Sequence, residues 1–386
     1  MSLPKLQTAV VQSPALPASS PADESLPLAV SDSVPIPVLP SSHHVLVRVL
    51  AVALNPTDFK MVTYFPRPFH GDTPALPIGC DFCGVVEDGS ESALRSFPVG
   101  TRVCGGLFPY GHADKGSNAV SGAFAQWVAA DANQLLRVPD GWDDLQGAAV
   151  GGICWGTCVL ALFEDPEALA LPGRPSKPEE KGRPVVVYGG ATATGTMACQ
   201  LLKLSGHYPI AVCSASSTPL VRSYGAIGTA AYTSPTCAES VRALSPDGVA
   251  IRHALDCITS PESVATCFAA IGRAGGRYAC LEALNDEWRT RKAIRTKEVM
   301  GFEGFGLRVT LGQDKGTTYS REANPELYAR GNQWAGEMQA ALDGGKIKAH
   351  PVREVHGRWE GIIEGLGMLR RGEVRGQKLV VRVGDA

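Results

Sequence analysis

The sequence predicts an α/β fold in which a doubly wound parallel sheet is joined to a second, β-rich domain. Between residues 184 and 281, short apolar runs alternate with helical segments, which is typical of parallel strands connected by crossover helices. Between residues 45 and 129, short runs rich in β-branched residues are separated by turn residues, which indicates a domain made mostly of strands. The 386 residues suffice for two or three domains.

Charge and composition argue against two classes of protein. The chain has 36 Lys and Arg residues and 38 Asp and Glu residues, so its formal charge is −2. A nucleic-acid-binding protein needs a basic field to displace counterions, and this balance does not supply one. A disordered chain combines low hydrophobicity with high net charge, whereas 44% of these residues are hydrophobic.

The cysteines indicate a reducing compartment. There are 11 of them, an odd number, and they are spread through the expected strands and helices rather than spaced as a disulfide framework. The first residues contain no continuous apolar run of signal-peptide length, and the last four are no retention or peroxisomal signal. We therefore expect free thiols and a cytoplasmic protein.

One stretch, residues 145–163, has no charged residue and must be weighed as a membrane span. It holds several glycines and too few large aliphatic side chains for a segment that crosses a bilayer. The better interpretation is a loop followed by a buried helix, so we expect no membrane partner.

The N-terminal half reads as a series of short strands. The first forty residues are rich in proline, which removes backbone donors, so only short or edge strands fit there. Strands are then expected over residues 45–54, 84–87, 101–104 and 125–129. Residues 164–184 are charged and proline-rich without apolar periodicity, and they predict a solvated loop.

The C-terminal half has the rhythm of strand, helix and strand. A helix is expected over 193–205 with Gly206 as its C-cap, another begins at Pro219, and a third covers 322–341. The expected strands are 184–188, 209–213, 251–258, 277–281, 346–355 and 378–383.

The strongest chemical signal is the run from Val185 to Gly195, a buried strand that turns sharply into a helix. The first amides of that helix have no partner within it, and with the helix dipole they can bind a pyrophosphate. Small residues let the phosphate approach the backbone, and the hydroxyls of Thr192 and Thr194 can add hydrogen bonds. Thr192 and Ala193 stand where glycine is usual, so a tight turn without a ligand is the alternative.

The end of the second strand distinguishes between nicotinamide cofactors. An enzyme that uses NAD usually places an acidic residue there to bind the ribose 2′-hydroxyl. This chain has Cys213-Ser-Ala-Ser-Ser-Thr218, followed by Arg222 on the next helix. Hydroxyls and a guanidinium suit a 2′-phosphate, so we expect NADPH; the alternative is a serine-rich loop with a solvated arginine.

A second candidate loop, Asn55 to Lys60, comes directly after an expected strand. Pro56 fixes the turn, and the Asn, Thr and Asp side chains can bond to nearby backbone. The functional interpretation puts this loop beside the nicotinamide, with Lys60 near a phosphate, the ribose or the substrate. A plain turn is the alternative.

Metal and hydrolase chemistry have little support. Cys80 and Cys83 form one C-x₂-C pair without a second pair or histidines at ligand spacing. The eight histidines show no H-E-x-x-H pattern, and no G-x-S-x-G is present. We expect no metal site.

These motifs together resemble the zinc-free branch of the medium-chain dehydrogenase/reductases. The resemblance is carried in the N-terminal half by Asn55-Pro-Thr-Asp58, Pro77 to Gly84 and Val99 to Val103. It implies a GroES-like domain over 1–155, a Rossmann domain that binds NADPH over 156–319, and a return to the first domain over 320–386.

A closer resemblance is to the fungal trans-acting enoyl reductases of the lovastatin type. It rests on Tyr188 to Thr194, Leu255 to Thr259, Cys267 to Gly276 and Gly376 to Arg382. That family implies reduction of the α,β double bond of an enoyl thioester held on the acyl carrier protein of a polyketide synthase or synthase–peptide hybrid (PKS-NRPS). We expect a monomer.

Two other functions stay open at this stage: a free-standing NADPH quinone or enone reductase acting on diffusible substrates, and a non-catalytic partner of a synthase.

The same resemblance implies positions for the site. The family's cofactor contacts fall on Thr57, Asp58, Phe59, Lys60, Thr192, Ala193, Thr194, Gly195, Ala215, Ser216, Ser217, Thr218, Tyr232, Glu282, Ala283, Gly376 and Gln377. Its substrate pocket falls on Thr157, Cys158, Val159, Leu160, Ala161, Leu162, Phe163, Glu164, Glu303, Gly304, Phe305, Gly306 and Leu307.

Lys60 and Thr157 are the catalytic candidates. Hydride addition to the β-carbon leaves an enolate on the thioester oxygen, which needs a hydrogen-bond donor, and the α-carbon then needs a proton. Backbone amides near Thr157, a ribose hydroxyl of the cofactor and water are further candidate donors, and Tyr64 is given no catalytic role. Such an enzyme can act chiefly by positioning its reactants.

Overall fold

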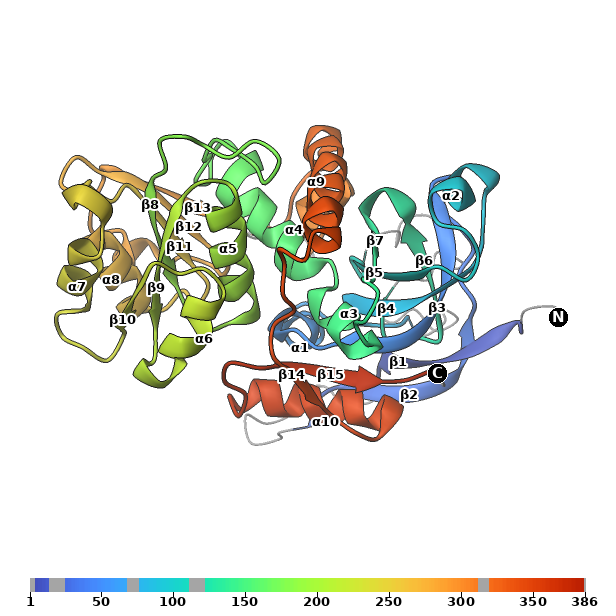
Figure 1. Ribbon diagram of the computed structural model, residues 1–386. Coiled ribbons are helices and arrows are strands. Elements are labelled where there is room, and N and C mark those ends of the chain that lie inside the picture. Colours follow the sequence, from blue (N-terminus) through green and yellow to red (C-terminus); the bar gives the residue numbers. More distant parts are fainter. Residues whose placement is uncertain (1–3, 14–24, 68–75, 111–121, 312–318, 385–386) are drawn as a thin grey trace. The chain divides into compact units, whose positions relative to one another are not determined.

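The computed structural model describes residues 4–13, 25–67, 76–110, 122–311 and 319–384 (Figure 1). The chain divides into two compact units. Unit 1 is Met1–Ile153, Phe305–Asn324 and Pro351–Ala386, and unit 2 is Cys154–Gly304 and Pro325–His350.

Unit 1 is built on a sheet whose strands run in the order β14-β15-β3-β4-β5-β7, with β6 also paired to β3 and with β1 and β2 forming a separate antiparallel pair. The bounds of these strands are β1 Leu6–Gln12, β2 Leu28–Pro35, β3 His44–Ala53, β4 Asp81–Gly89, β5 Arg102–Gly106, β6 Trp127–Asp131, β7 Leu136–Arg137, β14 Val352–Glu354 and β15 Lys378–Arg382. The helices are α1 Pro56–Tyr64, α2 Glu91–Ser96, α3 Asp144–Val150 and α10 Arg358–Arg370.

Strand β3 is central to unit 1 because it pairs with three others. It is antiparallel to β4, β6 and β15. Its valines Val45, Val47 and Val49 are buried in one hydrophobic core with Phe82 of β4 and Leu366 of α10. In the described part of the proline-rich N-terminus, β1 and β2 form a separate pair rather than joining the main sheet, and isolated bridges link β1 to Ala125 and Pro77. The two strands have seven and eight residues, so they are longer than the predicted short strands.

Unit 2 is built on a six-stranded parallel sheet of order β10-β9-β8-β11-β12-β13. Its strands are β8 Pro184–Tyr188, β9 Tyr208–Cys213, β10 Gly228–Ala231, β11 His253–Asp256, β12 Gly276–Cys280 and β13 Ile294–Glu298. Its helices are α4 Ile153–Val159, α5 Ala193–Leu204, α6 Thr218–Ser223, α7 Cys237–Ala243, α8 Pro261–Ala270 and α9 Pro325–Asp343. Short 3-10 turns cover Ala132–Gln134, Ala215–Ser217, Pro246–Gly248, Asp286–Trp288 and Gly301–Phe305.

Helices cover both faces of this sheet. Figure 1 shows α7 and α8 on one face and α5 on the other. Val186 and Val212 of the sheet lie in one core with Val241 of α7 and Phe268 of α8. The strand order reverses at β8, because the chain moves outward to β9 and β10 and then returns to β11. The predicted fold class, a doubly wound parallel sheet with a β-rich domain, is confirmed.

Two expected strands are shorter than predicted. Residues 251–258 yield only β11, and residues 346–355 yield only β14. In the second case the amide and carbonyl of Lys348 bond to the side chain of Gln200 at 2.8 and 3.2 Å, so they have no strand partner. The sequence pattern does not reveal that side-chain competitor.

The uncharged stretch 145–163 also differs from expectation. Its first part is not a loop but helix α3, which ends at Gly151 with a φ of +47°. Helix α4 follows and continues as a π-helix over Leu160–Glu164. In the described residues, Asp144–Glu164 is the one segment long and apolar enough to span a membrane, but 78% of its apolar window is buried inside the protein, as in a core helix.

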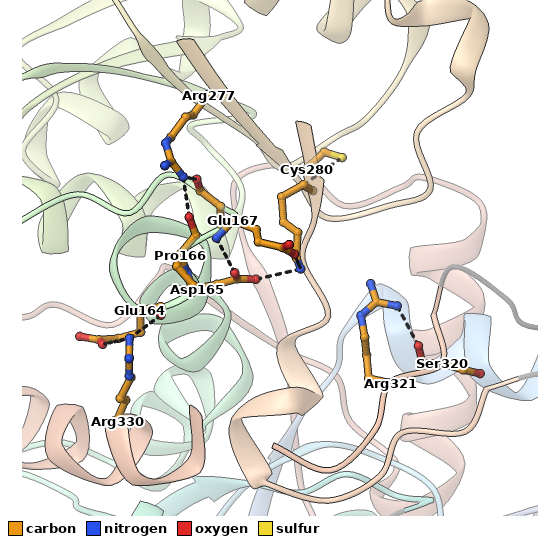
Figure 2. A network of polar contacts seen from close by, with 11 residues as sticks. Glu164, Asp165, Pro166, Glu167, Arg277, Cys280, Ser320, Arg321 and Arg330 are labelled. Carbon is orange, nitrogen blue, oxygen red and sulfur yellow. Dashed lines mark hydrogen bonds and ion pairs between the residues drawn. The ribbon is translucent and has the colours of Figure 1, made fainter. Parts of the chain in front are cut away.

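The connection after this segment was predicted to be a solvated loop, and its first part is not. Ala168, Leu169 and Leu171 are buried. Figure 2 shows the polar contacts that hold this part down, among them the Arg277 guanidinium, which donates to the carbonyls of Pro166 and Ala168 at 2.6 and 2.8 Å. The backbone carbonyls of this segment are therefore satisfied by Arg277 on β12, which is too far along the chain to be recognised from the local sequence.

Lys297 and the next helix add to the same network. The Lys297 ammonium lies 3.3 Å from Asp165 and 2.6 Å from Glu167. Glu164 accepts a hydrogen bond from the Trp334 indole at 2.6 Å. It also pairs with Arg330 (Figure 2). These contacts tie α9 to unit 2, whereas the sequence assigned all of 320–386 to the other domain. The expected boundary at 155/156 lies two residues from the division at 153/154.

Candidate functional site

The turn between β8 and α5 is closed by small residues and one threonine cap. Gly189 has a φ of +74°, a conformation that favours glycine. The Thr192 hydroxyl accepts from the Gly195 amide at 3.0 Å and donates to the Gly189 carbonyl at 2.8 Å. A Cβ on Gly195 would lie 2.3 Å from that carbonyl, so only glycine lets the helix approach the strand this closely.

This closure leaves a surface suited to an anion. The amides of Ala193 and Thr194 are in the first turn of α5, where no helical acceptor exists, and both residues are only half-buried. The Thr192 hydroxyl already donates its proton to the Gly189 carbonyl in this cap. It therefore has no proton left for the predicted hydrogen bond to a phosphate. Thr194 is directed otherwise: its hydroxyl is 4.0 Å from the Cys154 sulfur.

The parallel sheet brings the other predicted cofactor residues of unit 2 to the same edge. Ala215 to Thr218 follow the carboxyl end of β9, Tyr232 follows β10, and Glu282 and Ala283 follow β12. Because β10, β9, β8, β11 and β12 are consecutive neighbours, these segments line one edge with the β8–α5 turn. We call it the carboxyl edge.

The β9 end of this edge is rich in hydroxyls. Ser214 bonds to the hydroxyls of Ser216 and Ser217 at 3.0 and 2.7 Å. Arg222 follows on α6 with its side chain exposed, and Tyr232 is 48% exposed. The arrangement offers hydroxyl donors and a guanidinium to a ligand, and no carboxylate stands at the end of β9.

Asp256 organises the middle of the carboxyl edge, and the sequence reasoning did not single it out. Its buried carboxylate accepts from the amides of Ile258 and Thr259 at 2.9 and 3.0 Å and from the hydroxyls of Ser263 and Tyr278 at 2.5 and 2.8 Å. It thereby fixes the loop that enters α8. An acid at the end of an apolar strand followed by a Ser-Pro helix start was the available signal.

In unit 1 the predicted Asn55–Lys60 loop is the start of helix α1. The Asp58 carboxylate accepts from the Asn55 amide at 2.7 Å, which is the return bond of a capping box. The side chains of Asp58 and Phe59 are buried, while Thr57 and Lys60 are half-buried. Any side-chain contact with a ligand is therefore left to Thr57 and Lys60.

Beneath this helix lies a buried polar cluster centred on Asp81. One Asp81 oxygen accepts from the Asn55 side chain at 2.9 Å and lies 3.3 Å from the Lys378 ammonium. The other accepts from the amides of Gly152 and Ile153 at 2.8 and 2.9 Å. Lys378 also donates to the Asn55 side-chain carbonyl.

This cluster brings Gly376 and Gln377 near the start of α1, because both directly precede Lys378 on β15. Gly376 has a φ of +62°, and Gln377 is exposed. Sequence reasoning missed Asp81 and Lys378, although each is a charge at the start of a strand that continues with apolar residues. Such a charge predicts a buried partner.

The pKa of Asp58 is raised to about 7, mainly by burial and also by the neighbouring Asp81 charge. Hydrogen bonds from the Cys80 thiol and the Asn55 amide, and the Lys378 charge, act in the opposite direction. The carboxyl group is therefore half-protonated near neutral pH. It is a structural acid whose charge changes in the physiological range.

Most of the expected substrate residues are in the core of unit 2. Cys158, Val159, Leu160, Ala161, Leu162 and Phe163 are all buried. Phe163 stacks on Trp334 with ring centres 4.7 Å apart, and Glu164 bonds the same indole. Of this run only Thr157 and Glu164 are half-buried.

The other expected substrate segment has a different exposure. Glu303 is buried, while Gly304, Phe305, Gly306 and Leu307 are half-buried. Just before it, Gly301 faces Thr157: a Cβ on Gly301 would lie 2.4 Å from the Thr157 hydroxyl oxygen. Glycine at 301 therefore leaves room for that hydroxyl.

Across the described ranges, no three His, Cys, Asp or Glu side chains gather in a way that could hold a metal ion. All 11 cysteines are free, and all but Cys257 are buried. Cys80 and Cys83 lie within or beside strand β4, where burial raises the pKa of both thiols.

Comparison with known proteins places this geometry in a family. Residues 41–140 match the family described as "Alcohol dehydrogenase GroES-like domain". The chain is 54% identical to trans-enoyl reductase sthE of Phaeosphaeria nodorum, covering 98% of this chain and 97% of that one. It is 52% identical to trans-enoyl reductase calK of Penicillium decumbens, covering 98% of each.

The chain belongs to the trans-enoyl reductases. Among solved structures, an alcohol dehydrogenase superfamily protein from Novosphingobium aromaticivorans has a TM-score of 0.69 with 20% identity, over 98% of this chain and all of that one. This likeness confirms the fold.

As a trans-enoyl reductase the chain is an oxidoreductase that acts on a carbon–carbon double bond, which confirms the predicted family and activity. The resemblance to the medium-chain dehydrogenase/reductases implies a nicotinamide cofactor. The residues fit such a group in two respects: the first amides of α5 have no helical acceptor, and Gly195 leaves no Cβ in the turn beneath them.

The first prediction concerns this turn. Gly195→Ala places a methyl group 2.3 Å from a backbone oxygen, and we expect it to destabilise unit 2 by about 1–3 kcal/mol. Gly156→Ala, in helix α4 with open space at its Cβ, is the matched control and should be neutral or gain up to about 1 kcal/mol. Urea unfolding compares the two; equal stabilities would contradict the close approach.

The second prediction concerns Asp58. Its folded pKa is above the unfolded value of 3.8, so between pH 4 and 7 the unfolded state holds fewer protons and folding stability falls as the pH rises. Relative to wild type, Asp58→Asn should gain roughly 2–4 kcal/mol between pH 4.5 and 7.5, at about 1.4 kcal/mol per pKa unit.

Urea unfolding at several pH values measures this difference, with the exposed Asp247→Asn as control. The control curve should run parallel to wild type. A parallel curve for Asp58→Asn as well would show that Asp58 ionises normally.

Proposed function

We propose that this trans-enoyl reductase uses NADPH to reduce the α,β double bond of an enoyl chain held as a thioester on an acyl carrier protein. The partner is a polyketide synthase or a polyketide–peptide hybrid synthase. The names of the relatives, sthE and calK among them, support the reaction. The observation that carries the choice of cofactor is the end of β9, which has serine hydroxyls and no carboxylate.

The choice of NADPH over NADH rests on charge. A 2′-phosphate carries about two negative charges, and it is stabilised by a guanidinium and by hydroxyl donors, while a carboxylate would repel it. Ser216, Ser217 and the exposed Arg222 supply the donors beside β9. The turn before α5 would hold the pyrophosphate through the amides of Ala193 and Thr194.

When bound, NADPH would supply a hydride for the β-carbon, and the electron pair of the double bond would then collect on the thioester oxygen. The Thr157 hydroxyl, half-buried at the end of α4, is the donor that we assign to this oxygen. Lys60, half-buried on α1, is assigned to orient a phosphate, the ribose or the thioester. The α-carbon takes its proton from water or from a ribose hydroxyl.

The site residues divide into those that would contact a ligand, through side chain or backbone, and those that would shape the pocket. Thr57, Gly376, Gln377, Ala215, Thr218, Tyr232, Glu282 and Ala283 would contact the cofactor. Glu164, Gly304, Phe305, Gly306 and Leu307 would contact the acyl chain, and the buried run 158–163 would fix the pocket wall from behind.

The protein is proposed to act in the cytoplasm as a monomer. Free thiols at all 11 cysteines support a reducing compartment. Docking to a large synthase needs a free surface on each copy, and a monomer leaves one.

The third prediction tests cofactor and substrate together. Purified wild type should oxidise NADPH in the presence of crotonyl-pantetheine, with kcat/KM for NADPH at least about a hundredfold above that for NADH. Arg222→Ala should raise the KM for NADPH about tenfold and leave the weak NADH reaction unchanged, because it removes one charge-assisted bond. Arg353→Ala, an exposed arginine in unit 1, is the control.

Reconstitution extends this test to the carrier-bound chain. With a panel of purified polyketide synthases, the released product should be saturated at one double bond only when the protein and NADPH are both added. Rapid reduction of small quinones with inert enoyl thioesters would instead identify a quinone reductase acting on diffusible substrates.

The fourth prediction concerns the thioester oxygen. Thr157→Val keeps the shape but removes the donor, and kcat should fall about a hundredfold with little change in the KM for NADPH. Thr157→Ser should restore most of kcat. An unchanged kcat in the valine variant would assign the donor to a backbone amide or to water.

A further inference from the structure

The edge of the unit 2 sheet opposite the carboxyl edge has an unusual charge. The turns that lead into the amino ends of its strands are residues 178–183, 203–207, 225–227, 244–252, 271–275 and 290–293. They carry seven cations and three carboxylates. We call the surface formed by these turns and the first residues of the strands the amino edge.

The carboxyl edge has the opposite balance. Its turns, residues 189–192, 214–217, 232–236, 257–260 and 281–289, carry one cation, Arg289, and three carboxylates. Among the turns of this sheet, the excess of positive charge is thus at the amino ends of the strands. A parallel sheet makes this possible because all strands start at the same edge.

Most cations of the amino edge are exposed and lack carboxylate partners. Arg291 is half-buried and donates to the carbonyls of Phe268, Ile271 and Gly272. Across the described residues, ion-pair contacts are absent for Lys181, Arg183, Arg252, Arg273, Lys292 and Arg295. An exposed arginine without a local acid keeps its charge available to a second molecule.

These residues start neighbouring strands, but their side chains do not all share one face. His253, Arg277 and Arg295 are in register, so Arg252, one residue before His253, is on the opposite face of the sheet. Arg183 and Arg252 directly precede the neighbouring strands β8 and β11, and Arg295 pairs in register with Arg277 of β12. The backbone of Arg277 in turn bonds to the carbonyl of Arg252 at 2.8 Å. Burial, together with the charges of Arg183, His207, Arg277 and Arg252, lowers the pKa of His253 to about 4, as expected where cations converge.

Apolar side chains adjoin the cations on the same edge. Tyr208 at the start of β9, Ile227 before β10 and Val249 before β11 are 37, 43 and 51% exposed. Exposed aromatic and aliphatic side chains beside arginines are the composition of a protein–protein interface. A surface for nucleic acid needs phosphate contacts but no aliphatic centre.

We propose that the amino edge is the surface by which this reductase docks on an acidic patch of its polyketide synthase. The inference rests on the proposed function, since it presumes a synthase partner. Charge complementarity selects the partner: an acidic surface is attracted, whereas a second copy of this chain would bring cations against cations. Because the cofactor residues line the opposite edge, a partner bound here leaves that edge open to the substrate.

The test compares two triple variants. Arg252→Glu/Arg273→Glu/Arg295→Glu reverses the amino edge, and Lys5→Glu/Lys346→Glu/Arg353→Glu reverses three exposed cations elsewhere. Binding is measured by calorimetry against the synthase whose product the wild type saturates. The variant with the reversed amino edge should bind the synthase at least about tenfold more weakly than wild type. The control variant should bind it less than about threefold more weakly.

A milder variant guards against a folding defect. Arg252→Gln/Arg273→Gln/Arg295→Gln should weaken binding to an intermediate extent. When the NaCl concentration is raised from 50 to 300 mM, the affinity of wild type for the synthase should decrease, while that of the reversed variant stays nearly constant. All variants should reduce crotonyl-pantetheine at wild-type rates, which shows that fold and cofactor site are intact.

The outcomes separate the two proposals. Wild type that reduces no enoyl thioester defeats the proposed function, and the docking inference falls with it. If wild type reduces thioesters but binds the synthase no better than the reversed variant, the docking inference alone is defeated. The docking inference would also be overturned if the protein bound a random DNA duplex as tightly as the synthase. The same holds if light scattering showed a dimer that is lost when the amino edge is reversed.

Discussion

The buried carboxylate of Asp81 is the contact on which the arrangement of unit 1 depends. An ionised carboxylate without water is costly, and here it is compensated by the Lys378 ammonium, the Asn55 amide and two backbone amides. Removing one partner of such a group leaves an uncompensated charge and costs about 3–5 kcal/mol. The start of α1, the start of β15 and the last residues before α4 are therefore fixed relative to one another.

In unit 2, small residues shape the turn between β8 and α5. Its carboxyl edge must offer backbone amides to an anion, so side chains have to be kept out of the β8–α5 turn. Gly189 permits the turn, Gly195 permits the contact between helix and strand, and Thr192 satisfies one amide while leaving others open. Asp256 then holds the neighbouring loop with four hydrogen bonds, so the edge is rigid before any ligand arrives.

The two edges of one parallel sheet thus have different surfaces. Strand direction places the starts of α5, α6, α7 and α8, with their amides, at the carboxyl edge, and it places the strand entries at the amino edge. Hydroxyls and small residues collect at the first, and unpaired cations with exposed Tyr208 and Ile227 collect at the second. A sheet of this kind can bind a cofactor at one end and a protein at the other without competition between them.

The sequence by itself determined the fold class, most strands of both units, the β8–α5 turn and the family, because these depend on local periodicity, on glycine and on motifs read within a few residues. Tertiary structure alone decided which side chains are available. The apolar run 158–163 is buried, with Phe163 stacked on Trp334. The strand expected over 346–355 is reduced to β14, since Gln200 binds the backbone of Lys348, and α9 belongs with unit 2. The partners of Asp81, Asp256 and the 165–171 segment come from residues far along the chain, and a linear pattern contains no record of such contacts.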